Sequence, residues 1–280
     1  MTARRRVKTL TLTLLPPIQA WGLDRDGVPP TMKLRAWRKA AESGHAEAQF
    51  FLGFCYQYGK GVSKNFTTAA EWYAKSAAQG LAKAQFFLGA RYGRGEGVAQ
   101  DSRAAAAWCA KAAAQGCADA QHNLGVLYAN GTGVAQDFKA AAAWYAKAAA
   151  QGISVAQYNL GVHYDKGTGV AQDFKAAAAW YAMAAAQGFA EAQFNLGNLY
   201  ENGNGVAQDL KAAAARYTKA AAQGSAPAQY NLGVFYENGN CFAQDFKAAA
   251  AWYAKAAASG HLNAPARRDA CLARAAAASR

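Results

Sequence analysis

The chain has 280 residues and a formal net charge of +13 at neutral pH. Hydrophobic residues make up 53% of it, but about half of these are alanines, which predicts helices that pack through small side chains. No apolar run approaches the roughly 20 residues of a membrane-spanning helix, which excludes that class. The positive charge lies mainly in residues 1–44 and 261–280, whereas the 216 residues between them carry a net charge of only +4. A nucleic-acid groove would need a basic stripe along the fold, so none is expected.

Residues 1–32 do not share the pattern of the rest of the chain. They begin with basic residues and continue with a short apolar run from Leu10 to Leu15, which two prolines end. Three interpretations are open: a signal peptide, an organelle transit peptide, or an arm that packs on the following domain or stays a disordered tail. We favour the arm or tail. Residues 33–44 then predict a lone helix, because their sequence resembles the second helix of the units described next.

The body of the chain is periodic. Glycines recur every 36 residues in two columns, so that six unbroken units fill residues 45–260. A strict period of this length predicts a solenoid in which each unit packs only on its neighbours. The two columns are Gly53, Gly89, Gly125, Gly161, Gly197 and Gly233, and Gly44, Gly80, Gly116, Gly152, Gly188, Gly224 and Gly260.

Each unit contains two helical patterns, as the third unit shows. Ala120, Leu124 and Tyr128 form an apolar stripe of helical period on the first helix. The segment NGTG then breaks the pattern, because its glycines can adopt the positive φ of a tight reversal. Asp137 is a suitable N-cap for the second helix, and Gly152 stands where a helix-ending glycine is expected. The sequence therefore predicts an all-α fold built of helix hairpins.

The repeated pattern A-x-A-Q-x-x-L-G-x-x-Y-x-x-G-x-G-V-x-x-D-x-x-x-A-A-x-W-Y-x-K-A-A-x-Q-G resembles the Sel-one-like repeat (SLR) family, a relative of the tetratricopeptide repeats. The resemblance covers 216 of the 280 residues. It implies a right-handed α-solenoid whose first helices line a concave face. It also implies an adaptor or scaffold role in protein complexes.

The pattern weakens toward the end of the chain. Cys241 and Phe242 replace the Gly and Val of the earlier turns, so a turn of different shape is expected there. Residues 261–280 begin like a seventh unit, but Arg268 and Asp269 stand where Leu and Gly are expected. This suits a polar helix that caps the end of the stack.

Sequence motifs for catalysis, metal binding and cofactor binding are absent. There is no S-x-x-K, H-E-x-x-H or phosphate-binding G-x-x-x-x-G-K-[ST], and the four histidines are scattered along the chain. We therefore expect no enzyme activity, catalytic residue, metal site or cofactor. Cys109 and Cys117 are the best disulfide candidates, but eight helical residues span ~12 Å, which is too far. A mostly reduced protein favours the cytoplasm; secretion or a periplasmic location stays open.

A partner is expected on the face of the first helices that lies away from the packing stripe. An asparagine recurs there in units three to six, and its amide can donate to and accept from a peptide backbone. The alternative is that this asparagine bridges neighbouring helices. Units one and two carry phenylalanines instead, which either bind a hydrophobic partner or are covered by the N-terminal arm. The candidate residues are Asn123, Asn159, Asn195 and Asn231, then Val126, Val162, Asn198 and Val234, and finally Phe51, Phe54 and Phe87.

These observations favour a non-catalytic module that binds a peptide or a partner protein in the groove of the solenoid. The alternative is a protein that binds an anionic polymer or a membrane surface through its basic ends, and an enzyme is the third choice. The identity of the partner and the oligomeric state do not follow from the sequence.

Overall fold

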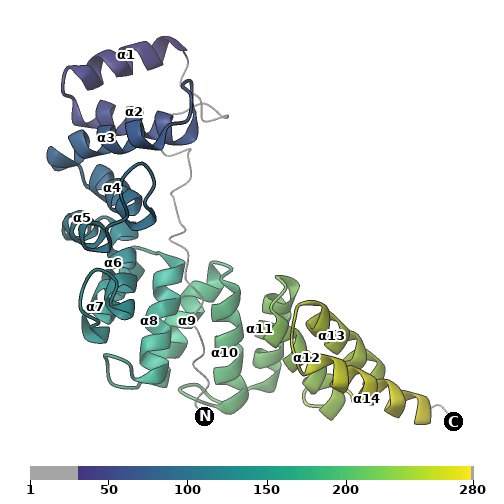
Figure 1. Cartoon of the computed structure of the whole chain (residues 1–280). Coiled ribbons are helices and arrows are strands. Elements are labelled where there is room, and N and C mark those ends of the chain that lie inside the picture. The colour runs from purple at the N-terminus through teal and green to yellow at the C-terminus, as the bar shows by residue number, and fades with distance from the viewer. Residues whose placement is uncertain (1–30, 279–280) are drawn as a thin grey trace. The chain divides into compact units, whose positions relative to one another are not determined.

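The computed structural model describes residues 31–278, which form 14 helices and no strand (Figure 1). These residues divide into two compact units between Ala148 and Ala149, in the last turn of α7. The six 36-residue units of the sequence are called repeats from here on. The name unit 1 is kept for the compact part that contains α1 to α7, and unit 2 for the part that contains α8 to α14. The helices are α1 (Thr31–Glu42), α2 (Ala46–Tyr58), α3 (Phe66–Ala78), α4 (Ala82–Arg94), α5 (Ser102–Ala114), α6 (Ala118–Asn130), α7 (Phe138–Ala150), α8 (Ser154–Lys166), α9 (Phe174–Ala186), α10 (Ala190–Asn202), α11 (Leu210–Ala222), α12 (Ala226–Asn238), α13 (Phe246–Ala258) and α14 (Ala264–Ala277).

Each repeat folds as a hairpin of two helices. In the fourth repeat, α8 ends at Gly167, which lies in the left-handed region with φ of 66°. The following helix, α9, begins at Asp173, whose Oδ1 accepts the backbone N–H of Ala176 at 2.9 Å. The cap satisfies a backbone donor that the helix itself leaves unpaired. The glycine and aspartate signals predicted from the sequence are confirmed, and so is the all-α solenoid of 36-residue helix hairpins.

A tyrosine from the second helix packs over the glycine in the middle of the first helix. A Cβ atom at Gly161 would lie 2.7 Å from ring carbons of Tyr181, so only glycine permits this approach. That approach offsets the helix propensity lost at the glycine, about 1 kcal/mol relative to alanine. We call the space that the ring fills the tyrosine slot. Its occupants are Tyr73, Tyr145, Tyr181, Tyr217 and Tyr253, while the second repeat has Cys109 at this position.

Glutamines join successive hairpins. Gln193 of α10 donates through Nε2 to the carbonyl oxygen of Ala185 in α9, at 3.2 Å. Gln223, at the end of α11, donates in turn to Oε1 of Gln193 at 2.9 Å. One buried amide thus connects three helices, and buried polar groups that are satisfied in this way fix the register of a stack. The same pair recurs as Gln49 with Gln79, Gln85 with Gln115, and Gln157 with Gln187.

On second helices of the hairpins, exposed lysines lie over tryptophan rings. In α7 the Nζ atom of Lys147 lies 3.9 Å from the ring centroid of Trp144, three residues earlier. The lysine charge stays in water while the ammonium group contacts the aromatic face. Similar pairs occur in α3, α5 and α13.

The turn of the sixth repeat differs from the others. A Cβ atom on Gly205 of the fifth repeat would lie 2.2 Å from the carbonyl carbon of Phe174, so that turn closes tightly on the preceding repeat. Within residues 31–278 every residue with positive φ is a glycine, and Cys241 therefore has another backbone conformation. Phe242 stacks on Tyr236 with a centroid distance of 4.5 Å. The change of shape predicted for this turn is confirmed.

Candidate interaction surface

A carboxylate stands at the same position of each first helix in unit 2. Asp165 of α8, Glu201 of α10 and Glu237 of α12 are spaced by 36 residues. Each accepts a hydrogen bond from the slot tyrosine of its own repeat; the hydroxyl of Tyr181, for example, lies 3.1 Å from Oδ2 of Asp165. Burial, with the carboxylate charge added to it, raises the pKa of Tyr181, so its hydroxyl stays protonated and donates. In unit 1 the same position holds Gln57, Gly93 and Ala129.

The predicted asparagines of unit 2 are half-buried. The side chain of Asn195 hydrogen-bonds to Tyr158 and to Tyr181, both of the preceding repeat. Asn231 likewise hydrogen-bonds to Tyr217. This is the bridging arrangement considered as the alternative to peptide binding. An amide offers up to four hydrogen-bonding positions, so these contacts leave capacity for a further partner.

The other predicted residues of this face are also half-buried. Val162 and Val234 pack against the hydrophobic clusters of their own repeats. Asn198 places its side-chain amide 2.6 Å from the hydroxyl of Tyr217. In unit 1, Val126 is half-buried on α6, and Asn123 lines a cavity between the second and third repeats. The predicted residues of unit 2 therefore lie on the same helices as the acidic positions.

The predicted phenylalanines of unit 1 belong to its core. Phe51, Phe54 and Phe87 are only 3–7% exposed. Rings of described residues surround them; Phe51, for example, lies 4.5 Å from the Trp37 ring centroid, and Phe87 lies 5.3 Å from that of Tyr73. Their burial corrects the expectation that they form an open apolar end of the binding face. The other alternative, cover by residues 1–32, falls on a segment that is almost entirely outside the described residues.

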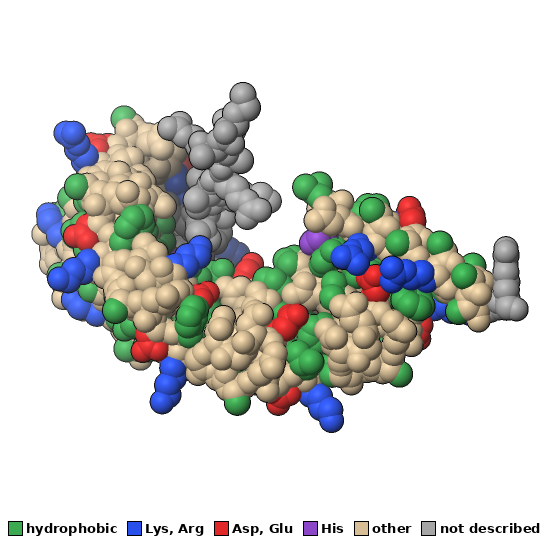
Figure 2. Space-filling view, turned by 90° about the horizontal axis from the view of Figure 1, so that it is seen from below, with side chains coloured by type: hydrophobic (Ala, Val, Ile, Leu, Met, Phe, Trp, Pro, Cys, Tyr) green, Lys and Arg blue, Asp and Glu red, His purple; other side chains and the backbone are tan. Residues whose placement is uncertain are grey.

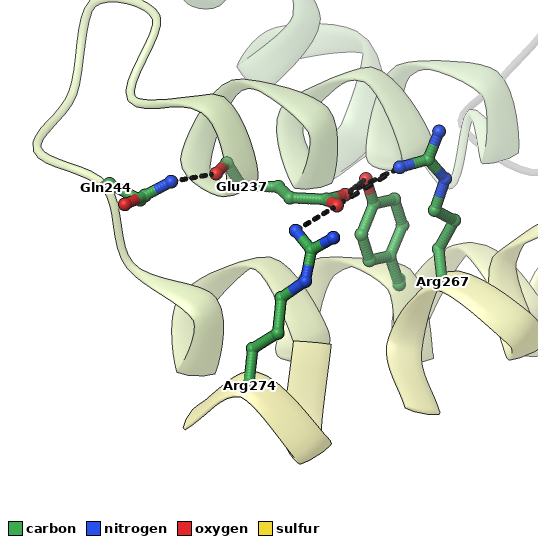
Figure 3. Close-up of polar contacts among 5 residues, drawn as sticks. Glu237, Gln244, Arg267 and Arg274 are labelled. Atoms are coloured by element: carbon green, nitrogen blue, oxygen red, sulfur yellow. Dashed lines mark hydrogen bonds and ion pairs between the residues drawn. The ribbon is translucent and has the colours of Figure 1, made fainter. Parts of the chain in front are cut away.

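The C-terminal helix completes one of the acidic positions (Figure 3). Glu237 is buried, and its carboxylate pairs with Arg267 at 3.1 Å and with Arg274 at 3.4 Å, both from α14. The hydroxyl of Tyr253 donates to the same carboxylate at 2.7 Å. The adjacent carboxylate raises the pKa of Arg267. Because Arg267 follows Asn231 by one 36-residue period, α14 occupies the position of a seventh first helix.

The remaining acidic positions of unit 2 are open to a cation. Among the described residues neither Asp165 nor Glu201 forms an ion pair, and both side chains are partly exposed. Arg267 and Arg274 correspond, one period earlier, to Asn231 and Asn238 beside Glu201. These asparagines are neutral and shorter than arginine. A guanidinium group from another molecule can therefore pair with Glu201 as Arg267 pairs with Glu237.

The face drawn in Figure 2 carries no single basic stripe. On the face drawn in Figure 2, Lys and Arg side chains stand singly or in small groups, with Asp and Glu side chains among them. In the C-terminal segment, Arg267 and Arg274 pair with Glu237, and Arg268 pairs with Asp269 at 2.8 Å. These ion pairs neutralise much of the positive charge that the sequence places at this end.

Within residues 31–278 no group of three or more His, Cys, Asp or Glu side chains is arranged to hold a metal ion. None of the helices in this range is both long and apolar enough to cross a membrane. All five cysteines are free thiols.

Six consecutive segments match the sequence model of the Sel1 repeat, at residues 46–81, 82–117, 118–153, 154–189, 190–225 and 226–261. They leave no gap between them and cover the whole of the periodic region found in the sequence. No curated protein matches the chain in sequence.

Among the solved structures that resemble this chain are the following two. One is that of c5321, a protective antigen present in uropathogenic Escherichia coli strains and displaying an SLR fold; its identity is 36% and its TM-score 0.80, over 84% of this chain and 50% of that protein. The other is a Sel1 repeat protein from Oxalobacter formigenes, with 33% identity and a TM-score of 0.71, over 95% of this chain and 74% of that one. The chain thus spans about half the length of the first relative.

Proposed function

Because the chain belongs to the Sel1 repeat family, we propose that it is a non-catalytic scaffold that binds a partner protein through the first helices of its repeats. The resemblance recognised in the sequence is thereby confirmed. Sel1 repeat proteins are generally scaffolds for protein–protein interactions and are typically non-catalytic. In unit 2 the proposed surface consists of Asp165 and Glu201 with the surrounding Asn159, Asn195 and Asn198, and its ligand is an arginine-bearing segment of the partner.

The contact of α14 with Glu237 carries this proposal. There the chain itself supplies two arginines to an acidic position of a first helix, at 3.1 and 3.4 Å. Charge-assisted hydrogen bonds of this kind are roughly twice as strong as neutral ones. Asp165 and Glu201 repeat the acidic position without the arginines, so a partner that supplies a guanidinium group would complete them in the same way.

A labelled nine-residue peptide of alternating Arg and Gly tests the proposal, with binding followed by fluorescence anisotropy. We expect Asp165→Asn combined with Glu201→Gln to weaken binding about 10-fold or more, because a hydrogen bond to a charged group contributes about 1.5–3 kcal/mol. The replacements still accept the tyrosine hydroxyls. Because the chain carries a net charge of +13, non-specific attraction does not favour this peptide.

The matched control is Glu42→Gln combined with Glu71→Gln, which removes two exposed carboxylates from unit 1 and changes the net charge equally. The same peptide with citrulline in place of arginine keeps the shape and removes the charge. If both double variants weaken binding equally, or if the citrulline peptide binds as well, the acidic positions of unit 2 are not the site.

The asparagines are tested separately by replacing Asn159 and Asn195 with alanine. If they also hold the backbone of the peptide, the loss of about 0.5–1.5 kcal/mol at each weakens binding roughly 5- to 150-fold. If they act only as bridges between repeats, the melting temperature falls and the affinity of the remaining folded protein does not.

A further inference from the structure

A partly enclosed cavity of about 70 Å³ lies in unit 1 between the second and third repeats. Its walls come from α4, α5, α6 and Thr132 of the turn after α6. Five of the residues that line it are Phe86, Gly89, Gly93, Cys109 and Asn123.

These five residues correspond to the five that form a filled tyrosine slot, two 36-residue periods later in the sequence. In the fourth repeat the ring of Tyr181 lies 5.9 Å from the ring centroid of Tyr158 and directly against Gly161. Its hydroxyl donates to Asp165 and also hydrogen-bonds with Asn195. Phe86, Gly89, Gly93 and Asn123 stand at the four wall positions, and Cys109 stands at the position of the tyrosine.

The second repeat has lost both the ring and the group that anchors it. Cys109 is short, and its Sγ atom donates to the carbonyl oxygen of Ala120 at 3.1 Å. Gly93 has no side chain where unit 2 has a carboxylate. A Cβ atom on Gly89 would meet the carbonyl oxygen of Ala105 at 3.1 Å and the backbone nitrogen of Cys109 at 3.3 Å, with no aromatic ring among its nearest atoms. The walls of the slot are therefore retained around an unfilled space.

We propose that this cavity binds a phenol ring supplied by another molecule. The ring would lie between Phe86 and Gly89, as the tyrosine rings do in the other repeats, and Asn123 would offer its amide to the hydroxyl. An apolar cavity of ~150 Å³ binds benzene. At about 70 Å³ this cavity is smaller and only partly enclosed, so it would take one edge of the ring, and the rest of the ring would lie in the open approach.

The binding is non-covalent. Burial raises the pKa of the Cys109 thiol to about 12, so at neutral pH it is protonated and is a poor nucleophile. Enclosure of the ring and its hydrogen bond supply the affinity. The site lies in unit 1, and it is independent of the acidic positions of unit 2.

Calorimetric titration of the full chain with p-cresol tests the proposal. We expect saturable binding at one site, and a loss of affinity of about 10-fold or more in Cys109→Tyr, because the chain then fills its own slot. Cys109→Ala is the matched control: it also removes the thiol but leaves the cavity open, so binding should persist. N-acetyltyrosinamide distinguishes the source of the ring. Binding of this compound as well as p-cresol indicates a tyrosine of a partner protein, and binding of p-cresol alone indicates a free phenol.

Gly93→Leu provides a second obstruction should Cys109→Tyr fail to fold. It places a side chain at the cavity wall and improves helix propensity in α4, and we expect it to abolish p-cresol binding. Absence of saturable binding to the unmodified chain overturns the proposal. Equal binding by the unmodified chain and by a folded obstructed variant overturns it as well.

Discussion

The two units build the same tyrosine slot with different chemistry at its polar end. In unit 2, the slot tyrosines of α9, α11 and α13 each donate to a carboxylate. In unit 1, the hydroxyl of Tyr73 donates instead to the neutral amide oxygen of Gln57 at 2.8 Å. The slot of the second repeat has neither a ring nor an acceptor side chain, and a cavity remains there.

This difference distinguishes the residues that the fold requires from the position that can vary without loss of the fold. The glycine under the ring and the glutamine pairs recur in both units, because they set the distance between helices and the register of the stack. The atom that receives the tyrosine hydroxyl contributes only about 0.5–1.5 kcal/mol as a neutral hydrogen bond, so it can vary without loss of the fold. That position is a carboxylate in unit 2, whereas in the second repeat of unit 1 it is Gly93, which lines a cavity.

Tyr181→Cys should have the largest effect, because it gives unit 2 the composition of the second repeat. The substitution removes a fully buried ring, and we expect the free energy of unfolding to fall by about 3–5 kcal/mol. Urea denaturation of the full chain measures the change, with Tyr181→Phe as the control that keeps the ring. A loss under about 1 kcal/mol would show that the ring does not hold the hairpin together.

The repeats and their helices follow from the sequence because their signals are local. Asp173 caps a helix and Gly167 ends one through backbone geometry that a single residue imposes. The helix hairpins therefore recur with the 36-residue period. The glutamine pairs also recur with the period, but their role depends on which carbonyl lies opposite, and spacing within one helix does not contain that information.

The candidate site is predicted less completely for the same reason. Helical spacing placed Asn195 and Phe87 on the same face, but it gave no account of what packs against that face. In the structure, Phe87 is enclosed by aromatic rings, whereas Asn195 lies between tyrosines. One available signal was missed: Arg267 follows Asn231 by 36 residues, opposite the acidic position of the preceding repeat.

Removal of the two arginines of α14 that pair with Glu237 should cause the next largest loss of stability. Arg267→Ala combined with Arg274→Ala leaves the Glu237 carboxylate buried without a counter-ion. Loss of a partner from a buried pair costs about 3–5 kcal/mol. We expect at most about 3 kcal/mol here, because the two guanidinium groups are 52% and 59% exposed. Chemical denaturation measures the loss.

The difference between the two units suggests a control for the double arginine variant. Adding Glu237→Gln to the two arginine variants gives unit 2 the neutral acceptor that Gln57 provides in unit 1, where Tyr73 donates to it at 2.8 Å. Stability should then recover in large part. A triple variant as unstable as the double variant would mean that the arginines act through packing of α14 and not through charge.

Replacing a slot glycine with alanine should have a smaller effect on stability. We expect a clear loss where a tyrosine fills the slot and little change where the slot is open. In Gly161→Ala the new Cβ atom would meet the ring of Tyr181 at 2.7 Å, and we expect a loss of about 1–3 kcal/mol from overpacking. In Gly89→Ala the nearest atom is the carbonyl oxygen of Ala105 at 3.1 Å. The gain in helix propensity, about 1 kcal/mol, should offset most of that strain. Melting temperatures of the two variants test this contrast, and equal losses would mean that the second slot is not open.

Alkaline pH should produce the smallest effect, through the thiol at the open slot. Burial raises the pKa of Cys109 to about 12, whereas an unfolded thiol titrates near ~8.5. Between these values the unfolded chain has lost the proton that the folded chain keeps, so stability is full below pH ~8.5 and falls as the pH rises. From pH 9 to pH 10 the loss is about 1 kcal/mol for this group. Cys109→Ala should remove that part of the decline in the free energy of unfolding, measured at both pH values. If the decline is unchanged in Cys109→Ala, the thiol is in contact with solvent in the folded chain.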